Sequence, residues 1–299
     1  MYLLIINPKS GNGNALPLWN EVEIKLKQQK VIYSSLISNS EAATQKFISN
    51  HLIVNKITAV AVLGGDGTTS SVIQEIAETD IPVAILPTGS GNDTARTFRL
   101  TADPENFVKG LLNMRSTTID LLNINGRFGI TIAGVGVDAI IGDRVNRSFY
   151  KPILNKLGIG SFAYTIAAVL TLLTFKSFTA KLTIDGQDDA LNKAWLTAIG
   201  NTSSYGGGLV VCPEALPTDG ILNITSLHSV SRMTILLQLF PSLLRGVPIA
   251  HRGVSYKKGK HVIIETNRPV PVIIDGEIMS TTPIEINIHD NALKLILTT

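Results

Sequence analysis

The sequence predicts an α/β domain over residues 1–120, followed by an all-β sandwich over residues 121–299. The first observation is length, because 299 residues are enough for two domains of ordinary size. The second is composition, since 44% hydrophobic and 16% charged residues allow substantial cores. The third is a change of pattern near 118–124. Apolar runs alternate with helix-like segments before it, and short runs of period two dominate after it.

The first domain alternates between strand-like and helix-like segments, as expected of an open, doubly wound parallel sheet. The run ITAVAVL is apolar on both faces, which is typical of a parallel strand covered by helices. In such sheets, ligands bind beyond the carboxyl ends of the strands. We expect strands at 2–8, 31–37, 57–63 and 81–87, and helices from the SGNGNA turn to about Lys30, from Ser40 or Glu41 to about Val54, from Thr69 to Glu78, and from Asn92 onward.

The second domain consists mainly of short alternating runs that end in Gly, Asn or Asp, the pattern of a β-sandwich. Two segments, 153–176 and 231–246, interrupt these runs with helical character. The runs expected as strands are IDLLNING, FGITIAGVGVDA, AKLTIDG, KAWLTAIGN, ILNITSL, HVIIETN, PVIIDGE, PIEINIH and LKLILTT.

Charge and cysteine content narrow the classes of function. The net charge of +3, without blocks of like charge, predicts no nucleic-acid-binding arm and is compatible with a weak preference for anionic partners. The single Cys212 excludes an internal disulfide and fits a reducing compartment. The N-terminal run lacks the basic region and cleavage site of a signal peptide, and 158–175 is too short and polar to span a bilayer. We therefore expect a soluble, cytoplasmic protein.

Three glycine-rich turns follow predicted strands of the first domain. They are NPKSG (7–11), GGDGT (64–68) and PTGSGND (87–93). Glycines let a ligand approach the backbone, whose N–H groups can bind phosphate together with Lys9 and the nearby hydroxyls. The alternative for NPKSG is a plain turn with a solvated lysine. Asp66 and Asp93 can face a ribose or Mg²⁺, or each can cap the helix that follows. The turns match neither a Walker A loop nor a dinucleotide fingerprint.

Two motifs of the second domain also carry carboxylates. PVIIDGE (271–277) ends in Glu277, which can be a general base or belong to an ordinary turn. YGGG (205–208), followed by PEALPTDG (213–220), can hold a hard cation through loop carbonyls and Asp219, or can be turns without metal. The histidines and the cysteine show no zinc-ligand spacing.

In this order and spacing, NPKSG, GGDGT, PTGSGNDTAR, a GN before YGGG, PEALPTDG and DGE resemble the diacylglycerol kinase catalytic family. The similarity is greatest to its bacterial soluble lipid kinases, with sphingosine, ceramide and, more distantly, NAD kinases as relatives. The resemblance spans essentially the whole chain. It implies an ATP-binding domain and a lipid-binding sandwich with the active site between them. It also implies ATP- and Mg²⁺-dependent transfer of the γ-phosphate to a lipid hydroxyl, with diacylglycerol as the expected acceptor and phosphatidic acid as the product.

The resemblance assigns roles to individual residues. Asp66 and Asp93 would organise Mg²⁺-ATP, Lys9 would add positive charge at the γ-phosphate, and Glu277 would accept the proton of the lipid hydroxyl. A structural Mg²⁺ would be bound by Asp219 and the carbonyls of Leu216 and Ile221. The nucleotide-binding residues would be Asn7, Pro8, Lys9, Ser10, Gly11, Ser38, Gly64, Gly65, Asp66, Gly67, Thr68, Thr69, Ser70, Ser71, Ser90 and Asn92.

One departure from the family lies at Thr69-Ser70-Ser71, where relatives commonly have x-Asn-Glu after GGDGT. Hydroxyls there replace an amide and a carboxylate, but the other carboxylates are retained and still predict an active enzyme. Two alternatives remain open. The first is NAD kinase-like phosphorylation of a soluble acceptor, and the second is a catalytically silent nucleotide- or membrane-binding module.

If the acceptor is a lipid, the protein is expected to act at a membrane surface. The candidate docking segments are 154–176 and 231–246, and the alternative is that both pack against the sandwich. We expect a cytoplasmic protein that associates peripherally with the membrane. Its partners would be ATP and a lipid substrate, with no nucleic acid, and a homodimer is compatible with the sequence.

Overall fold

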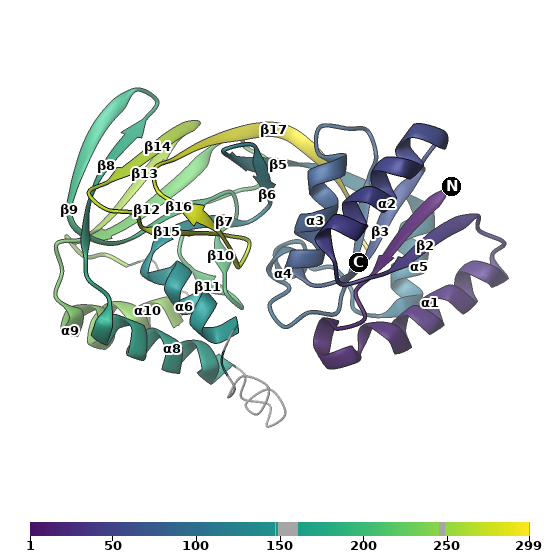
Figure 1. The fold of residues 1–299 in the computed structure, drawn as a ribbon, viewed down its shortest axis with the longest axis horizontal. Coiled ribbons are helices and arrows are strands. Elements are labelled where there is room, and N and C mark those ends of the chain that lie inside the picture. The colour runs from purple at the N-terminus through teal and green to yellow at the C-terminus, as the bar shows by residue number, and fades with distance from the viewer. Residues whose placement is uncertain (147, 149–160, 245–248, 299) are drawn as a thin grey trace. The chain divides into compact units, whose positions relative to one another are not determined.

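The computed structural model (Figure 1) describes residues 1–146, 148, 161–244 and 249–298. Contacts divide the chain into unit 1, Met1–Leu121 with His289–Thr299, and unit 2, Leu122–Ile288. The sequence predicted domains at 1–120 and 121–299. The observed division differs from this prediction at the C-terminal segment, which belongs to unit 1. The fold class is the predicted one, with an N-terminal α/β domain followed by a β-sandwich-like domain.

Unit 1 contains a parallel sheet in the order β2-β1-β3-β4. The strands are apolar on both faces, and side chains such as Leu4, Ile6 and Leu63 are fully buried. Helices α1 and α5 cover one face, while α2 and α3 pack together on the other (Figure 1). The strands are β1 (Tyr2–Ile6), β2 (Tyr33–Ile37), β3 (Ala59–Gly64) and β4 (Val83–Pro87), and the helices are α1 (Ala15–Gln28), α2 (Glu41–Val54), α3 (Asp66–Ile76), α4 (Asp93–Phe98) and α5 (Pro104–Asn113), with a short 3₁₀ turn η1 (Ser10–Gly13).

Two helices of unit 1 differ from the prediction. Helix α3 begins at Asp66 rather than Thr69, and Gly65 precedes it as the N-cap residue with the extended backbone usual at that position. The carboxylate of Asp66 therefore lies in the first turn, where the helix dipole favours negative charge. Helix α5 was not predicted separately, although Asp103 caps it through the backbone N–H of Asn106 and Pro104 occupies its first turn.

Unit 2 is built around the long strand β9, which pairs with β8 along its first half and with β7 and β12 along its second. Strand β13, which was not predicted, pairs with β12. The strands are β5 (Ser116–Ile124, begun in unit 1), β6 (Arg127–Gly129), β7 (Ile132–Gly136), β8 (Phe178–Ile184), β9 (Gln187–Gly200), β10 (Ser204–Tyr205), β11 (Leu209–Val210), β12 (Leu222–His228), β13 (Val254–Gly259), β14 (His261–Thr266), β15 (Pro271–Ile274), β16 (Glu277–Thr281) and β17 (Ile284–Ile296).

The last two predicted strands, PIEINIH and LKLILTT, form the single strand β17. Residues Ile284–Asn287 pair with β14 in unit 2, and Leu295 pairs with Val83 of β4 in unit 1. The sequence His-Asp-Asn between the two runs indicated a turn, but Asn291 stays in the strand. Its backbone N–H donates to Asp120 Oδ1 at 2.7 Å, which holds it there.

The helices of unit 2 are α6 (Val137–Asn146), α8 (Ser161–Thr174), and the consecutive α9 (Arg232–Thr234), η2 (Ile235–Leu239) and α10 (Phe240–Leu244). The prediction of a strand through GVGVDA was wrong at its end. Gly136 adopts a φ of 123°, a conformation that glycine permits, and the chain turns there from β7 into α6. Parts of both predicted docking segments, 154–160 and 245–246, lie outside the described residues. No helix in the described part combines the length and hydrophobicity needed to cross a bilayer.

Candidate active site

The three glycine-rich turns meet at the carboxyl edge of the unit 1 sheet. The turn after β1 continues the sheet, because the backbone N–H of Asn7 donates to Leu63 O at 3.0 Å. The backbone N–H of Thr88 donates to Gly64 O at 3.0 Å, which joins the turns after β3 and β4. Ser38 follows β2 at the same edge, where its N–H donates to Ile6 O at 2.9 Å. The expected clustering of these residues therefore follows directly from the parallel topology.

Side chains of the first turn bind both of the others. Asn7 Nδ2 donates to Thr68 Oγ1 at 3.0 Å, and Thr88 Oγ1 donates to Ser10 Oγ at 2.8 Å. Asn7 Oδ1 also accepts the backbone N–H of Lys9 at 3.0 Å, so Asn7 fixes its own turn. The side chains of Lys9 and Ser90 lie at the surface of the same edge. A rigid framework of backbone amides is thus bordered by exposed polar side chains.

Two glycines explain why these turns can lie so close together. Gly11 has a φ of 59°, and a Cβ added to it would lie 2.2 Å from Thr88 O. A Cβ on Gly89 would lie 2.6 Å from Gly65 Cα, so these two turns are in backbone contact. Asn92 closes the third turn, since its Oδ1 accepts the Gly89 N–H at 2.9 Å and its Nδ2 donates to Gly89 O at 2.8 Å.

Asp66 connects the second turn to the third. Its Oδ2 accepts the backbone N–H of Asp93 at 3.1 Å, and its Oδ1 accepts that of Thr94 at 3.3 Å. Burial raises the pKa of the Asp66 carboxyl, while these backbone hydrogen bonds lower it in part. Asp66 therefore caps the start of α4, whereas the capping interpretation of the sequence assigned it to the helix that directly follows it.

Gly91 marks a point that both carboxylates face. A Cβ at Gly91 would lie 3.0 Å from Asp66 Oδ2 and 3.8 Å from Asp93 Oδ2. Because residue 91 is a glycine, no side chain of its own lies between these two oxygens. Carboxylate oxygens that converge on one point suit a hard divalent cation such as Mg²⁺. The residues present at this edge therefore fit the Mg²⁺ that the resemblance implies, in addition to their capping contacts.

The departure from the family pattern, Thr69-Ser70-Ser71, lies inside α3 and is buried. Thr69 Oγ1 donates to Gly65 O at 3.2 Å, and Ser71 Oγ donates to Gly67 O at 3.0 Å. These hydroxyls bond the carbonyls of their own helix. Their observed contacts therefore stabilise the helix start behind the turn.

In unit 2, the two carboxylates of the Asp-Gly-Glu motif have different surroundings. Asp275 and Gly276 form the turn between β15 and β16 with φ values of 48° and 84°. The buried Asp275 carboxylate accepts the N–H groups of Ile130 and Thr131, each at 2.8 Å, and the Thr131 hydroxyl at 2.6 Å. Glu277, by contrast, is exposed at the start of β16. Asp275 thus anchors the turn, and Glu277 is the carboxylate of the motif that solvent reaches.

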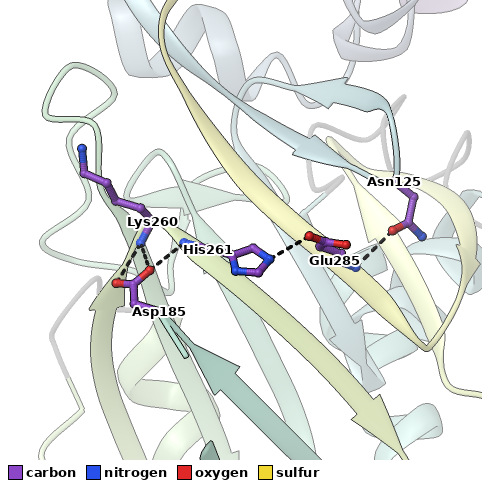
Figure 2. Close-up of polar contacts among 5 residues, drawn as sticks. All are labelled: Asn125, Asp185, Lys260, His261 and Glu285. Atoms are coloured by element: carbon purple, nitrogen blue, oxygen red, sulfur yellow. Dashed lines mark hydrogen bonds and ion pairs between the residues drawn. The ribbon is translucent and has the colours of Figure 1, made fainter. Parts of the chain in front are cut away.

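The anchoring role of Asp275 has a parallel in the turn between β8 and β9. There the Asp185 carboxylate accepts the N–H groups of Lys260 and His261, both at 2.9 Å, and these bonds lower its pKa (Figure 2). His261 Nε2 in turn contacts Glu285 Oε1 at 2.8 Å, and the Glu285 N–H donates to Asn125 Oδ1 at 3.1 Å. Turn aspartates of unit 2 therefore bind the backbone of neighbouring strands.

The predicted structural metal site lies in the loop before β12. Asp219 Oδ1 accepts the backbone N–H of Ile221 at 3.1 Å, and Leu216 is exposed in the same loop. This loop supplies one carboxylate with neighbouring carbonyls, a set of hard oxygen donors. Within the described residues, no group of three His, Cys, Asp or Glu side chains is arranged to hold a metal.

Sequence reasoning missed one buried carboxylate, Asp138, at the turn from β7 into α6. Its Oδ2 accepts the hydroxyl of Tyr205 at 3.1 Å, and its Oδ1 accepts the Ala139 N–H at 2.8 Å. Burial raises the pKa of Asp138 to about 6. The signal was available, because Asp138 comes directly after a strand that ends in glycine, much as Asp66 does.

An α/β unit with carboxylates at its sheet edge, joined in one chain to a β-sandwich-like unit, defines a kinase that uses a nucleotide. Residues 1–124 match the diacylglycerol kinase catalytic domain. Residues 131–297 match the YegS C-terminal NAD kinase beta sandwich-like domain. The chain belongs to the diacylglycerol kinase catalytic family, a family of lipid kinases, as its motifs predicted.

Individual relatives agree with this assignment. A diacylglycerol kinase of Mycobacterium tuberculosis is 34% identical over 298 residues, which cover 98% of this chain and 93% of the relative. A diacylglycerol kinase from Bacillus anthracis has a similar fold, with a TM-score of 0.74 at 22% identity over 99% of this chain and 96% of that chain. Yeast NADH kinase, solved with NADH, is a more distant neighbour with a TM-score of 0.56 at 12% identity, over 100% of this chain and 84% of that chain.

Proposed function

We propose that the protein is an ATP- and Mg²⁺-dependent lipid kinase that transfers the γ-phosphate to the hydroxyl of diacylglycerol and so forms phosphatidic acid. The observation that carries the proposal is that the carboxylates of Asp66 and Asp93 both lie beside Gly91. This point lies among turns whose backbone amides are held at the carboxyl edge of a parallel sheet, where phosphate is commonly bound.

The nucleotide phosphates would lie against the backbone of the turns around Gly11, Gly65 and Gly89. Lys9, Ser10 and Ser90 border that edge and would donate to phosphate oxygens, while Ser38 would lie on the ribose or base side. Asn7, Asn92 and the α3 residues 69–71 would hold the turns in shape, since their contacts are internal to unit 1. Catalysis would come from positioning and charge neutralisation, as in other phosphoryl transfers.

Asp66 and Asp93 would bind the Mg²⁺ that accompanies ATP. When bound, that ion neutralises charge on the phosphate oxygens. Asp219, with the carbonyls of Leu216 and Ile221, would hold a second, structural Mg²⁺ in unit 2.

Glu277 would act as the general base. Its exposed carboxylate would accept the proton of the lipid hydroxyl as the hydroxyl oxygen attacks the γ-phosphorus and ADP departs. Because the acceptor is hydrophobic, the enzyme would work at the surface of the membrane. We place it on the cytoplasmic side. Homodimer formation is a further expectation, which sedimentation at several protein concentrations would test.

A panel of acceptors tests the proposal. The purified chain is incubated with γ-labelled ATP, Mg²⁺ and one acceptor. The acceptor is diacylglycerol, monoacylglycerol, phosphatidylglycerol or ceramide dispersed in detergent, or NAD in solution. Label in phosphatidic acid, and weaker or no label in the other products, is the expected result. Label in NADP alone would establish the soluble-acceptor alternative. No label with any acceptor, from protein that still binds ATP, would support the silent-module alternative.

A further inference from the structure

Helix α8 of unit 2 is apolar on both its inner and its outer face. Ala167, Ala168 and Leu172 are buried against the unit. Large side chains on the opposite side recur with helical spacing but remain in solvent, with exposed fractions between 37% and 55%. This outer stripe consists of Ile166, Val169, Leu170 and Leu173.

The apolar surface continues in the helical segment after β12. Met233 and Leu237, one turn apart, are 59% and 68% exposed. The two segments meet where Arg232 Nη2 donates to the backbone carbonyl of Phe175, directly after the end of α8. We call the stripe together with Met233 and Leu237 the bilayer face. Clustered exposed apolar residues of this kind mark interaction sites rather than ordinary surface.

Charge is distributed unequally along the sequence, and the stretches that carry the bilayer face are basic. The stretches 144–184 and 220–264, which contain all of its residues, hold twelve Lys and Arg and no Asp or Glu. The remainder of the chain holds fourteen Lys and Arg against 23 Asp and Glu. The small net charge of +3 therefore conceals a strongly basic portion and an acidic remainder.

Two arginines are held at the end of α8, Arg232 within this basic portion and Arg268 four residues beyond its second stretch. Arg232 lies 5.7 Å from the ring centroid of Trp195, and Arg268 lies 5.7 Å from that of Phe175. Arg268 also donates to the carbonyl of Lys176, as Arg232 does to Phe175. Both arginines and Lys176 remain exposed. Since a guanidinium has five N–H donors, more than one carbonyl can take, each arginine can also bind a lipid phosphate.

We propose that the bilayer face inserts into the interface of an anionic bilayer, with Lys176, Arg232 and Arg268 contacting lipid phosphates. The inference rests on the proposed function, because a lipid acceptor is drawn from a membrane. An apolar helix face bordered by cations lies in the plane of an anionic interface. A second copy of the chain is a poorer occupant, since a symmetric contact would bring two basic surfaces together.

Vesicle sedimentation of the full chain tests the apolar part. Leu170→Gln/Leu173→Gln keeps good helix formers in α8 but removes apolar surface, and Ile53→Gln/Val54→Gln is the matched control in unit 1, where both side chains are highly exposed. With phosphatidylglycerol-containing vesicles, the α8 variant should bind on the order of tenfold more weakly than the control. Equal binding by the two variants would overturn the proposal.

Vesicle composition tests the charged part. Wild-type protein should bind phosphatidylglycerol-containing vesicles on the order of tenfold more tightly than pure phosphatidylcholine vesicles. Arg232→Gln/Arg268→Gln keeps donors for the two carbonyls but removes both charges, and should lose most of that difference. Equal binding of wild type to both vesicle types would contradict the inference, as would an α8 variant that only converts a dimer to a monomer.

Kinase activity on detergent-dispersed lipid separates this inference from the proposed function. Sedimentation needs no catalysis. Protein that binds vesicles as expected but phosphorylates no lipid would therefore refute the proposed lipid kinase function and still support insertion of the bilayer face. Conversely, protein that phosphorylates dispersed diacylglycerol but binds vesicles equally well in all variants would refute only the bilayer face.

Discussion

The carboxylate of Asp66 and the backbone N–H of Asp93 lie 3.1 Å apart, so the two aspartates of unit 1 are joined through a hydrogen bond. The contact locks the turn after β3 to the turn after β4. It also leaves Asp66 Oδ2 and Asp93 Oδ2 facing the point beside Gly91. Asp66 therefore both joins the two turns and presents a carboxylate oxygen near Gly91, so its capping contact with α4 is compatible with a functional role.

Asp66→Ala should abolish both ATP binding and turnover. The substitution removes the acceptor of two backbone N–H groups and one carboxylate that faces Gly91. We expect kcat/KM to fall by roughly 100-fold or more, as when other groups that stabilise developing charge are removed. Calorimetric titration with Mg²⁺-ATP and the lipid assay measure the two losses.

The matched control is Asp103→Ala, which removes another helix-capping aspartate of unit 1. It should cost about 1 kcal/mol of stability and leave ATP binding unchanged. If Asp66→Ala bound ATP as well as Asp103→Ala does, Asp66 would have only a capping role.

Gly91→Ala should weaken the response to Mg²⁺ selectively. Its Cβ would lie 3.0 Å from Asp66 Oδ2 and intrude on the point that both carboxylates face. We expect the Mg²⁺ concentration that gives half-maximal activity to rise roughly tenfold, and excess Mg²⁺ to restore much of the rate. A titration of activity with Mg²⁺ at fixed ATP measures this shift. An unchanged titration curve would place the metal elsewhere.

Glu277→Gln should lose turnover while ATP binding is retained. The exposed carboxylate is replaced by an amide that cannot accept the hydroxyl proton, and loss of a general base lowers rates by roughly 10²–10⁴-fold. Glu285→Gln is the control, since Glu285 is also an exposed carboxylate of unit 2 and lies in β17, outside the Asp-Gly-Glu motif. Comparable kcat values for the two variants would remove Glu277 from the mechanism.

Asp138→Asn should flatten the pH dependence of stability. Folding raises the pKa of Asp138 from 3.8 to about 6, so the folded state binds its proton more tightly than the unfolded state does. The free energy of unfolding of the wild type therefore falls as the pH rises from about 4 to about 6, and stays lower above that. The variant lacks this titration and should gain on the wild type across that window, by up to on the order of 3 kcal/mol.

Urea unfolding at successive pH values measures the difference. Tyr205→Phe removes the hydroxyl that donates to Asp138 and should move the wild-type step to higher pH. A difference between Asp138→Asn and wild type that does not vary with pH would show that this carboxyl keeps its ordinary pKa.

Features set by local sequence were predicted well. The strands and helices of unit 1 were predicted from apolar runs, which can be seen within short stretches. Their alternation implies a parallel sheet, and a parallel sheet brings the three turns to one edge. The start of α3 at Asp66 was missed because Asp66, Gly67 and Thr68 carry no apolar periodicity.

Features set by distant contacts were not predictable in the same way. His289–Thr299 return to unit 1 because Leu295 pairs with Val83, more than two hundred positions earlier. Asp275 is buried and Glu277 is exposed. The burial of Asp275 comes with its hydrogen bonds to Ile130 and Thr131, which the Asp-Gly-Glu motif itself does not reveal. The buried state of Asp138 likewise depends on Tyr205, from a hairpin far along the chain.

The central claim is that this chain moves the γ-phosphate of ATP to a lipid hydroxyl. The most direct test is the initial rate at which label passes from γ-labelled ATP into extractable phosphatidic acid, with diacylglycerol and Mg²⁺ present. The wild type should form labelled phosphatidic acid in step with ADP release, and almost none should form with Glu277→Gln or without Mg²⁺. Release of ADP with no label in lipid, or no turnover of ATP by folded wild-type protein, would contradict it.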